Sequence, residues 1–476
     1  MKQLPFYLLA FVLVGFVFEQ NGLGQDTTKQ SSVADDYKDA AKKLIEFGRK
    51  ENNAYLKLQE LCDDIGHRLS GSKELDKAIA WAQKSMKADG HENVRAEKVM
   101  VRKWVRGKES CELLEPRPLK FEMLGLGGSV ATPKEGIVAE VVVVDSKEEL
   151  DKLSDEEVEG KIVCFNAAMP PYSRATGSGY GRVVQYRSNG AVWAAERGAV
   201  AALVRSVTAY SLNSPHTGAM RYKADVKKVP AAAISVEAAT MLARLQKRGK
   251  KTKVKLYMEA KDEGMVPSAN VLAEIVGSEK PEEIVVIGGH IDSWDVGQGA
   301  QDDGAGCVAA MEALTLIRKL KLKPKRTIRV VLWTNEENGI AGATAYLARH
   351  QNETHVAGIE SDSGGFAPEG LSVEMKDEKK QELAVEQLRD ILQLLRPINA
   401  TNVRAGFSGV DVGQLKVLGT ACLGLQVDGR RYFNTHHTWA DTVDKVDRKE
   451  LGDCAITVAV AAFILADMPE RLGEKK

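Results

Sequence analysis

From about residue 270 onward, short apolar runs alternate with longer segments whose apolar residues recur every three to four positions. The apolar runs are EIVVIGGH, TIRVVLWT, HVAGIE and TACLGLQV, and the longer segments cover about 303–320, 339–350, 379–395 and 448–468. The runs are typical of buried strands, and the longer segments are typical of helices. This alternation predicts an α/β fold with a mixed, mostly parallel sheet covered by helices on both faces.

The chain before residue 270 divides into two parts. Apolar residues have helical spacing from Tyr37 to Cys62, and a second helix is predicted over about 73–86. Between 126 and 255, strand-like runs such as GIVAEVVVV, GKIVCFN and AVAALVRS stand between glycine and proline breaks, without a cluster of acids and histidines. We therefore expect residues 25–125 and 256–476 to form one domain that carries an inserted β-rich domain at 126–255.

The first residues are typical of an export signal. Lys2 is followed by the apolar run LPFYLLAFVLVGFVF and then by polar residues that end in Gly22-Leu23-Gly24. The alternative is a membrane anchor, but the run is shorter than the roughly 20 residues of a spanning helix. We expect residues 1–24 to be a cleaved signal peptide and the protein to be secreted or exported, to the medium, periplasm or a lumen, without a membrane span.

The balanced charge of the chain argues against a polyanionic partner. The chain has 476 residues, enough for two or three domains, and its 66 Lys+Arg balance its 66 Asp+Glu. Because no net charge favours a polyanion, we expect no nucleic-acid partner. The six cysteines form no CxxC pair, and their pairing cannot be read from the sequence.

Histidines and acids follow the ends of the four predicted strands near the C-terminus. Ligands of open α/β sheets bind beyond the carboxyl ends of the strands, so we expect these side chains at one rim. They are His290 after the first run, Glu336 and Glu337 after the second, Asp362 after the third, and His436 and His437 some ten residues after the fourth, with Asp302 just before a predicted helix.

The residue types at this rim predict a hydrolytic zinc site. Imidazoles and carboxylates without thiolates are typical of catalytic rather than structural zinc. Five ligands are too many for one zinc ion that keeps an open position, and they suit two ions that share a carboxylate. The glycine-rich stretch from Gly288 to Gly306 would let the backbone bend so that His290 and Asp302 reach the same ions. We therefore expect two Zn²⁺ per chain.

The motifs HxD, DDG, NEE, a lone Asp after a strand and HxxxDT together resemble the co-catalytic zinc exopeptidases of metallopeptidase clan MH. The stretches IGHRLSGSKELDKAIAWA, VVQYRSNGAVWAAERGA and GGHIDSWDVGQGAQDDGAG resemble, within that clan, the carboxypeptidase Q (plasma glutamate carboxypeptidase) family. This resemblance covers nearly all of the mature chain. It implies a zinc exopeptidase fold, an inserted domain of the protease-associated type beside the active-site cleft, short peptide substrates and a homodimer.

The resemblance also implies a role for each residue at the rim. His290 and Asp362 would hold one zinc ion, Glu337 and His437 the other, and Asp302 would bridge them, with Glu336 as general base and His436 as a stabiliser of the oxyanion. His437 is preferred to His436 because it stands four residues before Asp441, as in the HxxxD motif. Glu360 competes with Asp362 for the ligand role, and Asp292 is expected to orient the imidazole of His290.

These observations favour a secreted dizinc carboxypeptidase or dipeptidase. Aminopeptidase action is the nearest alternative, because both activities use the same zinc core and differ in the pocket walls. A single-zinc glutaminyl cyclase and a non-catalytic, receptor-like protein share this fold as more distant alternatives. The full set of five ligands argues against both, since a cyclase does not need all five and a receptor of this kind has lost them.

Overall fold

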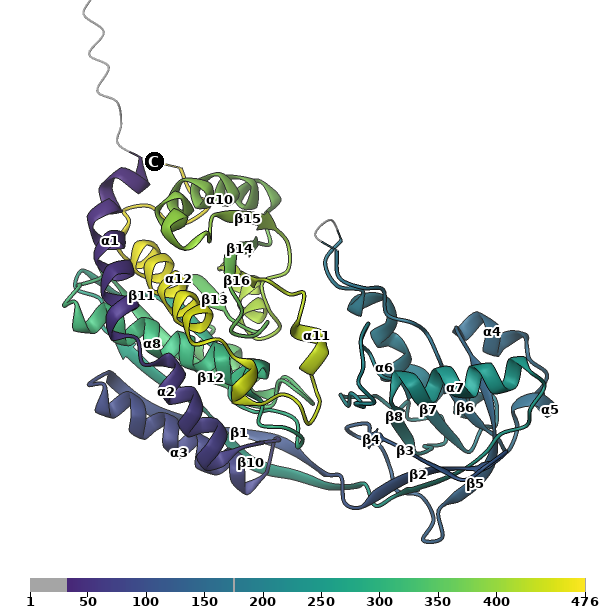
Figure 1. Cartoon of the computed structure of the whole chain (residues 1–476). Helices are drawn as coiled ribbons and strands as arrows, with labels where there is room; N and C mark the ends of the chain where they lie inside the picture. The colour runs from purple at the N-terminus through teal and green to yellow at the C-terminus, as the bar shows by residue number, and fades with distance from the viewer. Residues whose placement is uncertain (1–31, 174–175, 476) are drawn as a thin grey trace, which may run out of the picture.

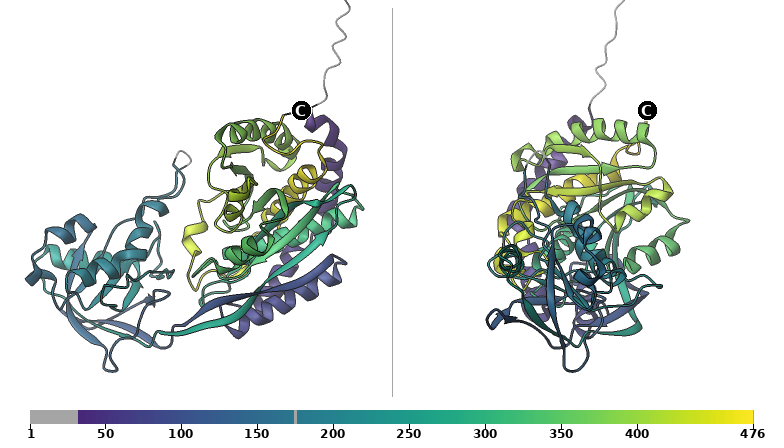
Figure 2. Two further views of the ribbon diagram at one scale, coloured as in Figure 1. Left: turned by 180° about the vertical axis from the view of Figure 1, so that it is seen from behind. Right: turned by 90° about the vertical axis from the view of Figure 1, so that its right-hand side faces the viewer.

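The computed structural model describes residues 32–173 and 176–475, and the predicted signal peptide lies outside these ranges. Two eight-stranded sheets, each with its own helices, form two lobes that Figures 1 and 2 show joined by the long strands β1 (Glu92–Val105) and β10 (Lys261–Ile275). We call residues 32–105 and 261–475 the main lobe, and residues 106–260 the second lobe.

The sheet of the main lobe is mixed, and its centre is parallel. In the order β1-β10-β12-β11-β13-β16-β14-β15, the four adjacent strands from β12 to β16 run parallel, whereas β10 and β14 are antiparallel to their neighbours β12 and β16. Besides β1 and β10, its strands are β11 (Lys280–His290), β12 (Arg326–Trp333), β13 (Thr354–Glu360), β14 (Pro368–Glu374), β15 (Asn402–Ala405) and β16 (Ala421–Val427).

Helices cover both faces of this sheet. The helices packed on the larger core are α1 (Val33–Glu51), α2 (Ala54–Gln59), α3 (Lys73–Ala88), α8 (Ala305–Lys319), α10 (Glu378–Ile391) and α12 (Arg448–Asp467). The other face packs against α9 (Ala341–His350) and the 3-10 helix η4 (Val412–Leu418). Within the described residues, no helix has the length and apolarity of a membrane span. The apolar run of α12 is instead buried in the core, as its sequence predicts.

The second lobe is a mixed sheet of short strands. Its strands are β2 (Glu109–Glu115), β3 (Leu119–Phe121), β4 (Met123–Gly125), β5 (Ile137–Val144), β6 (Ile162–Phe165), β7 (Ala201–Arg205), β8 (Ala231–Ile234) and β9 (Lys253–Met258). Its helices are α4 (Lys147–Lys152), α5 (Asp155–Val158), α6 (Tyr180–Glu196) and α7 (Val236–Lys247). The sheet takes in three strands before residue 126, because β2 pairs with β9 and β4 pairs with β8 across the lobe.

Buried polar contacts fix the two lobes against each other. Arg106, at the start of the second lobe, donates to both carboxylate oxygens of Asp295 in the main lobe, at 2.9 and 2.6 Å. Trp294 packs into the core of the second lobe, where a Cβ on Gly127 would overlap its ring. The backbone N–H of Thr217 donates to the carbonyl of His437 at 3.0 Å. The second lobe is therefore docked beside the rim where the parallel strands end.

The structure confirms the predicted alternation and also contains strands that the pattern did not predict. All four apolar runs are strands, and the helices predicted near the C-terminus begin and end within a few residues of the expected positions. Strands β1 and β10 were missed because charged residues occupy many of their exposed positions and because β10 contains Pro267, a residue type that argues against a strand. The six cysteines are free and buried, so none is paired in a disulfide.

Candidate active site

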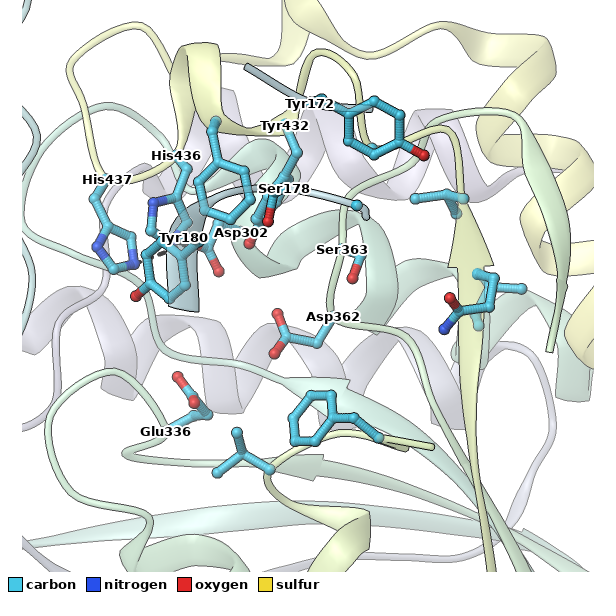
Figure 3. Close-up of a pocket in the computed structure, with 18 of the residues that line it drawn as sticks. Tyr172, Ser178, Tyr180, Asp302, Glu336, Asp362, Ser363, Tyr432, His436 and His437 are labelled. Atoms are coloured by element: carbon cyan, nitrogen blue, oxygen red, sulfur yellow. Dashed lines mark ion pairs between the residues drawn. The ribbon is translucent and has the colours of Figure 1, made fainter. Parts of the chain in front are cut away.

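The predicted site residues meet at one rim because the strands that precede them are parallel neighbours. His290 is the last residue of β11, Glu336 and Glu337 follow β12, and Asp362 follows β13. His436 and His437 come after β16 and the short helix α11 (Tyr432–Thr435). Figure 3 shows the carboxylates of Asp302, Glu336 and Asp362 and the rings of both histidines around one space.

Asp302 stands at the centre and faces a histidine with each carboxylate oxygen. Its Oδ1 lies 3.2 Å from His290 Nε2, and its Oδ2 lies 3.1 Å from His437 Nε2. His290 Nε2 is also 3.4 Å from Asp362 Oδ1, and His437 Nε2 is 3.1 Å from Glu337 Oε2. The five side chains therefore form two groups of three that share Asp302.

The donor atoms of this cluster fit two divalent cations. His290 Nε2, Asp302 Oδ2 and Glu337 Oε1 are buried and have no hydrogen-bond partner among the described residues, which is rare for buried polar atoms. Donors around a tetrahedral zinc ion, each 2.0–2.1 Å from it, are about 3.3 Å apart. The separations of 3.1 to 3.4 Å within the two groups match that spacing.

Negative charge exceeds positive charge in this cluster. Burial, together with the nearby Asp302 carboxylate, raises the pKa of Glu337 to about 7. Burial likewise raises the pKa of Glu336 well above its usual range. Burial alone would lower the pKa of His437, but the Glu337 and Asp302 carboxylates raise it to about 10. These directions show that the buried acids need nearby positive charge, which bound cations would supply.

A backbone carbonyl, rather than the expected carboxylate, orients His290. His290 Nδ1 lies 2.9 Å from the carbonyl oxygen of Asp292 but 3.8 Å from the Asp292 carboxylate. A proton on Nδ1 therefore leaves the lone pair of Nε2 facing Asp302 and Asp362. The Asp292 carboxylate accepts hydrogen bonds from the backbone N–H of Glu336 and from Ser70 Oγ, so it positions the Glu336 backbone.

The second lobe orients His437 in the same way. Its Nδ1 lies 3.2 Å from the carbonyl oxygen of Thr217, so a proton there directs the lone pair of Nε2 toward Asp302 and Glu337. The ring of His436 stacks on that of His437 with centroids 3.5 Å apart. His436 Nε2 is 3.6 Å from Asp302 Oδ2, which is farther than His437 Nε2 is. The geometry favours His437 as the donor in this group.

Asp362 and Glu360 have different surroundings, although both lie near the end of β13. The Glu360 carboxylate accepts hydrogen bonds from the backbone N–H groups of Val410 and Val412, at 3.0 and 2.6 Å. Asp362 instead faces His290. Glu360 therefore supports the loop before η4, and Asp362, just after β13, is the acid that reaches the cluster.

The loop that carries Asp302 is held by several buried contacts. The Asp302–Asp303 peptide bond is cis, and Asp303 accepts hydrogen bonds from the backbone N–H groups of His290 and Gly306. The Asp441 carboxylate accepts from the N–H groups of Gln301 and Asp302. Sequence reasoning used Asp441 only as a spacing marker, although its place in HxxxD could have suggested this contact.

Arg68 also supports this loop, and sequence reasoning missed it. Its fully buried guanidinium donates to the carbonyl oxygens of Ile291, Gln298 and Gly299 at 2.6 to 2.9 Å. Gly299 has a left-handed φ of 58°, and a Cβ there would crowd Ser293. Any residue type can supply the backbone carbonyls that Arg68 contacts, so the sequence does not reveal them. The arginine within GHRLSGS was the one visible indication of these contacts.

A cavity of about 500 Å³ opens beside the cluster and is lined by both lobes. Tyr172, Tyr180 and Arg187 come from the second lobe, and Arg404 and Phe407 from the main lobe. This volume lies in the range of sites for small ligands, so it suits a short peptide better than a folded protein.

Comparison with known proteins places this cluster in a family. Residues 270–462 match the model of "Peptidase family M28". The chain is 42% identical to carboxypeptidase Q of Mus musculus over 99% of both chains, and 43% identical to that of Homo sapiens over 91% of this chain and 90% of the other. A crystal structure of a peptidase M28 precursor from Shewanella amazonensis has a TM-score of 0.86 and 34% identity, covering 92% of this chain and 98% of the other. The protein is therefore a metallopeptidase of family M28 and belongs within it to the carboxypeptidase Q group.

Proposed function

We propose that this metallopeptidase is a dizinc carboxypeptidase or dipeptidase that acts on short peptides. The observation that supports it best is that each carboxylate oxygen of Asp302 faces a different histidine. His290 and Asp362 would hold one Zn²⁺, Glu337 and His437 would hold the other, and Asp302 would bridge the two. The names of the relatives favour carboxypeptidase over aminopeptidase action.

The chain's own residues account for the proton transfers of peptide hydrolysis. Lewis acidity toward water and the scissile carbonyl is the chemistry that two bound zinc ions supply. Glu336 lines the cavity and lies 3.9 Å from His290 Nε2, so it is placed to take a proton from the attacking water and return it to the leaving amine. His436, stacked against His437, is placed to donate to the developing oxyanion.

We further propose the setting of this activity. The basic and apolar N-terminus supports export, to the medium, periplasm or a lumen, after cleavage near residue 24. The second lobe, whose strands lie between Glu109 and Met258, would be the inserted protease-associated domain, which the sequence led us to expect at 126–255. A homodimer rests on the family resemblance alone.

Two measurements test the proposal. Mass spectrometry should find close to two zinc ions per chain, whereas about one would favour a cyclase and none a non-catalytic protein. A panel of dipeptides, each also prepared with its amino end or its carboxyl end blocked, should show that a free carboxyl end is required. Cleavage that persists when only the amino end is blocked indicates carboxypeptidase action, and a need for both free ends indicates a dipeptidase. A strict need for a free amino end together with tolerance of a blocked carboxyl end would replace the proposal with aminopeptidase action.

A further inference from the structure

Phe407 is a large apolar residue that the fold leaves uncovered at the candidate active site. It is 69% exposed, yet it lines the same cavity as Asp302, Glu336 and Asp362. Among the large apolar residues that are exposed in the described part of the chain, it alone lines this cavity. A single exposed apolar residue on an outer surface is ordinary, but one at a ligand cavity offers apolar surface for a ligand to cover.

Three further apolar residues continue this surface along the main-lobe wall of the cavity. They are Val410, Leu425 and Val427, and the last two end strand β16. Ser372 Oγ lies 2.7 Å from the carbonyl oxygen of Phe407 and 3.3 Å from that of Gly424 in β16, so the loop of Phe407 lies beside this strand. The main lobe therefore gives the cavity an apolar wall, whereas the second lobe lines it with hydroxyl groups and a guanidinium.

Contacts to the backbone hold Phe407 in place without covering its ring. The Glu360 carboxylate accepts hydrogen bonds from the N–H groups of Val410 and Val412, at 3.0 and 2.6 Å. A Cβ on Gly409 would overlap that carboxylate, so the loop fits closely against it. A ring on a fixed loop loses little conformational freedom when a ligand covers it, and more of the gain from burial then appears as affinity.

The charged residues at this end of the cavity favour neither sign of ligand. Arg404 and Glu369 both line the cavity and lie 3.8 Å apart, with side chains 51% and 27% exposed. Because these opposite charges face each other, neither is an unpaired charge that would select an ionic side chain. The apolar wall is therefore the feature of this end that can distinguish between substrates.

The exposure of Phe407 indicates which residue of a substrate it would meet. Phe407 follows β15, the edge strand of the main sheet, whereas His436 and His437 beside the candidate cation site are buried. The cavity is thus open at Phe407 and enclosed at the histidines. A carboxypeptidase removes a single residue, which the enclosed part suits. The open part suits the residue on the amino side of the scissile bond, from which a longer peptide continues outward.

We propose that Phe407, together with Val410, Leu425 and Val427, binds the side chain on the amino side of the scissile bond and makes the enzyme prefer an apolar residue there. This inference rests on the proposed carboxypeptidase or dipeptidase function and assigns part of its specificity to the main lobe. The preference arises because an apolar side chain on this wall removes apolar surface of both partners from water.

Kinetics with the dipeptides Leu-Ala and Gly-Ala test this role. The wild type should cleave Leu-Ala with a kcat/KM about tenfold or more above that for Gly-Ala, the size expected for burial of a leucine side chain. Phe407→Ala and Phe407→Asn should lose most of this preference. Phe407→Leu should keep most of it, because the side chain stays apolar.

The matched control is Val417→Ala, which shortens another exposed apolar residue, 62% exposed on η4 and outside the cavity lining, and should leave the preference unchanged. An equal loss on both dipeptides would overturn the proposal by making Phe407 a support of its loop. An effect on Gly-Leu in place of Leu-Ala would overturn it by placing the C-terminal residue at this wall. An altered mass in light scattering with an unchanged preference would overturn it by assigning the ring to a contact between chains.

A binding arm separates failure of this inference from failure of the proposed function. Calorimetry on the zinc-loaded Glu336→Gln variant, in which turnover should be slow, should show Leu-Ala binding more tightly than Gly-Ala. Adding Phe407→Ala to this variant should remove the difference. If the wild type cleaves no dipeptide but the difference is present, the proposed function is wrong and the apolar site stands. If the wild type cleaves both dipeptides equally well and Phe407→Ala changes neither binding nor cleavage, Phe407 is not part of the substrate site.

Discussion

Replacing Arg68 by methionine should destabilise the main lobe and loosen the candidate metal site. Methionine keeps much of the buried apolar length of arginine but removes the guanidinium, which is fully buried and donates to four backbone carbonyls. Three of these bonds, to Ile291, Gln298 and Gly299, are 2.9 Å or shorter, and the fourth, to Gly66, is 3.4 Å.

The magnitude follows from those bonds. Each hydrogen bond to a charged group contributes roughly 1.5–3 kcal/mol, but the freed carbonyls can in part turn toward water, so the three strong bonds do not add in full. A buried carbonyl that is left without a donor costs about 1–3 kcal/mol. We therefore expect Arg68→Met to lower the free energy of unfolding by about 4 kcal/mol, and Arg68→Lys, which keeps the charge but fewer donors, by about half as much.

Urea unfolding followed by tryptophan fluorescence measures this change, with and without zinc. The control is Arg102→Met on β1, whose side chain is 62% exposed and whose pairing with Asp262 should contribute less than about 1 kcal/mol. Because Gly299 lies three residues before Asp302, Arg68→Met should also weaken zinc binding at least about tenfold. If Arg68→Met unfolds at the same urea concentration as the control, the carbonyl contacts do not stabilise this loop and the reasoning is wrong.

Three further outcomes test the site itself. Glu336→Gln should retain both zinc ions and lose about 10²–10⁴-fold in kcat, and wild-type turnover in this variant would remove Glu336 from the mechanism. His437→Ala should bind less zinc by mass spectrometry, whereas two tightly held ions would make His436 the ligand. Without metal, the free energy of unfolding should fall as pH rises from about 5 to 8. Burial raises the pKa of Glu337 from 4.5 to about 7 in the folded protein. The stability that protonated Glu337 contributes is therefore full below the unfolded-state pKa and is lost as pH rises through the folded-state pKa. Urea titrations in chelator measure this slope, which zinc should flatten; a metal-free protein that gains stability over this range would contradict it.

The sequence predicted that the site residues would come together, but it did not predict the contacts that hold them in place. His290, Glu337 and Asp362 come together because they follow parallel neighbouring strands, and both strand pattern and metal-capable residue types are visible in a sequence. Their metal binding is still a proposal, but their proximity is observed. A contact to a backbone carbonyl cannot be recognised from residue types in the sequence. The carbonyls that orient His290 and His437, and those that Arg68 binds, belong to residues whose side-chain identity is irrelevant to the contact.

The organisation of the two lobes was also only partly visible, for a related physical reason. A strand is recognised by the alternation that burial of one face imposes, and the first seven residues of β10, in the ribbon between the lobes, include no buried residue. Its partner β1 does show the alternation there, with Val99, Val101 and Trp104 buried, and sequence reasoning missed it. The pattern therefore located the two sheets but not the ribbon that joins them. The apolar runs of β5, β6 and β7, which are buried within the second lobe, were all located.

The docking of the second lobe has a direct chemical consequence for the site. His437 faces Asp302 and Glu337 with Nε2 only while the carbonyl of Thr217, from the second lobe, accepts the proton on Nδ1. The same short segment packs behind the Arg187 guanidinium. One stretch of the second lobe thus sets the tautomer of a candidate ligand and contacts a buried guanidinium at the cavity wall. If His437 binds metal as proposed, a separation of the lobes should weaken that binding, and we expect the Arg106–Asp295 pair, which joins the lobes, to support it from a distance.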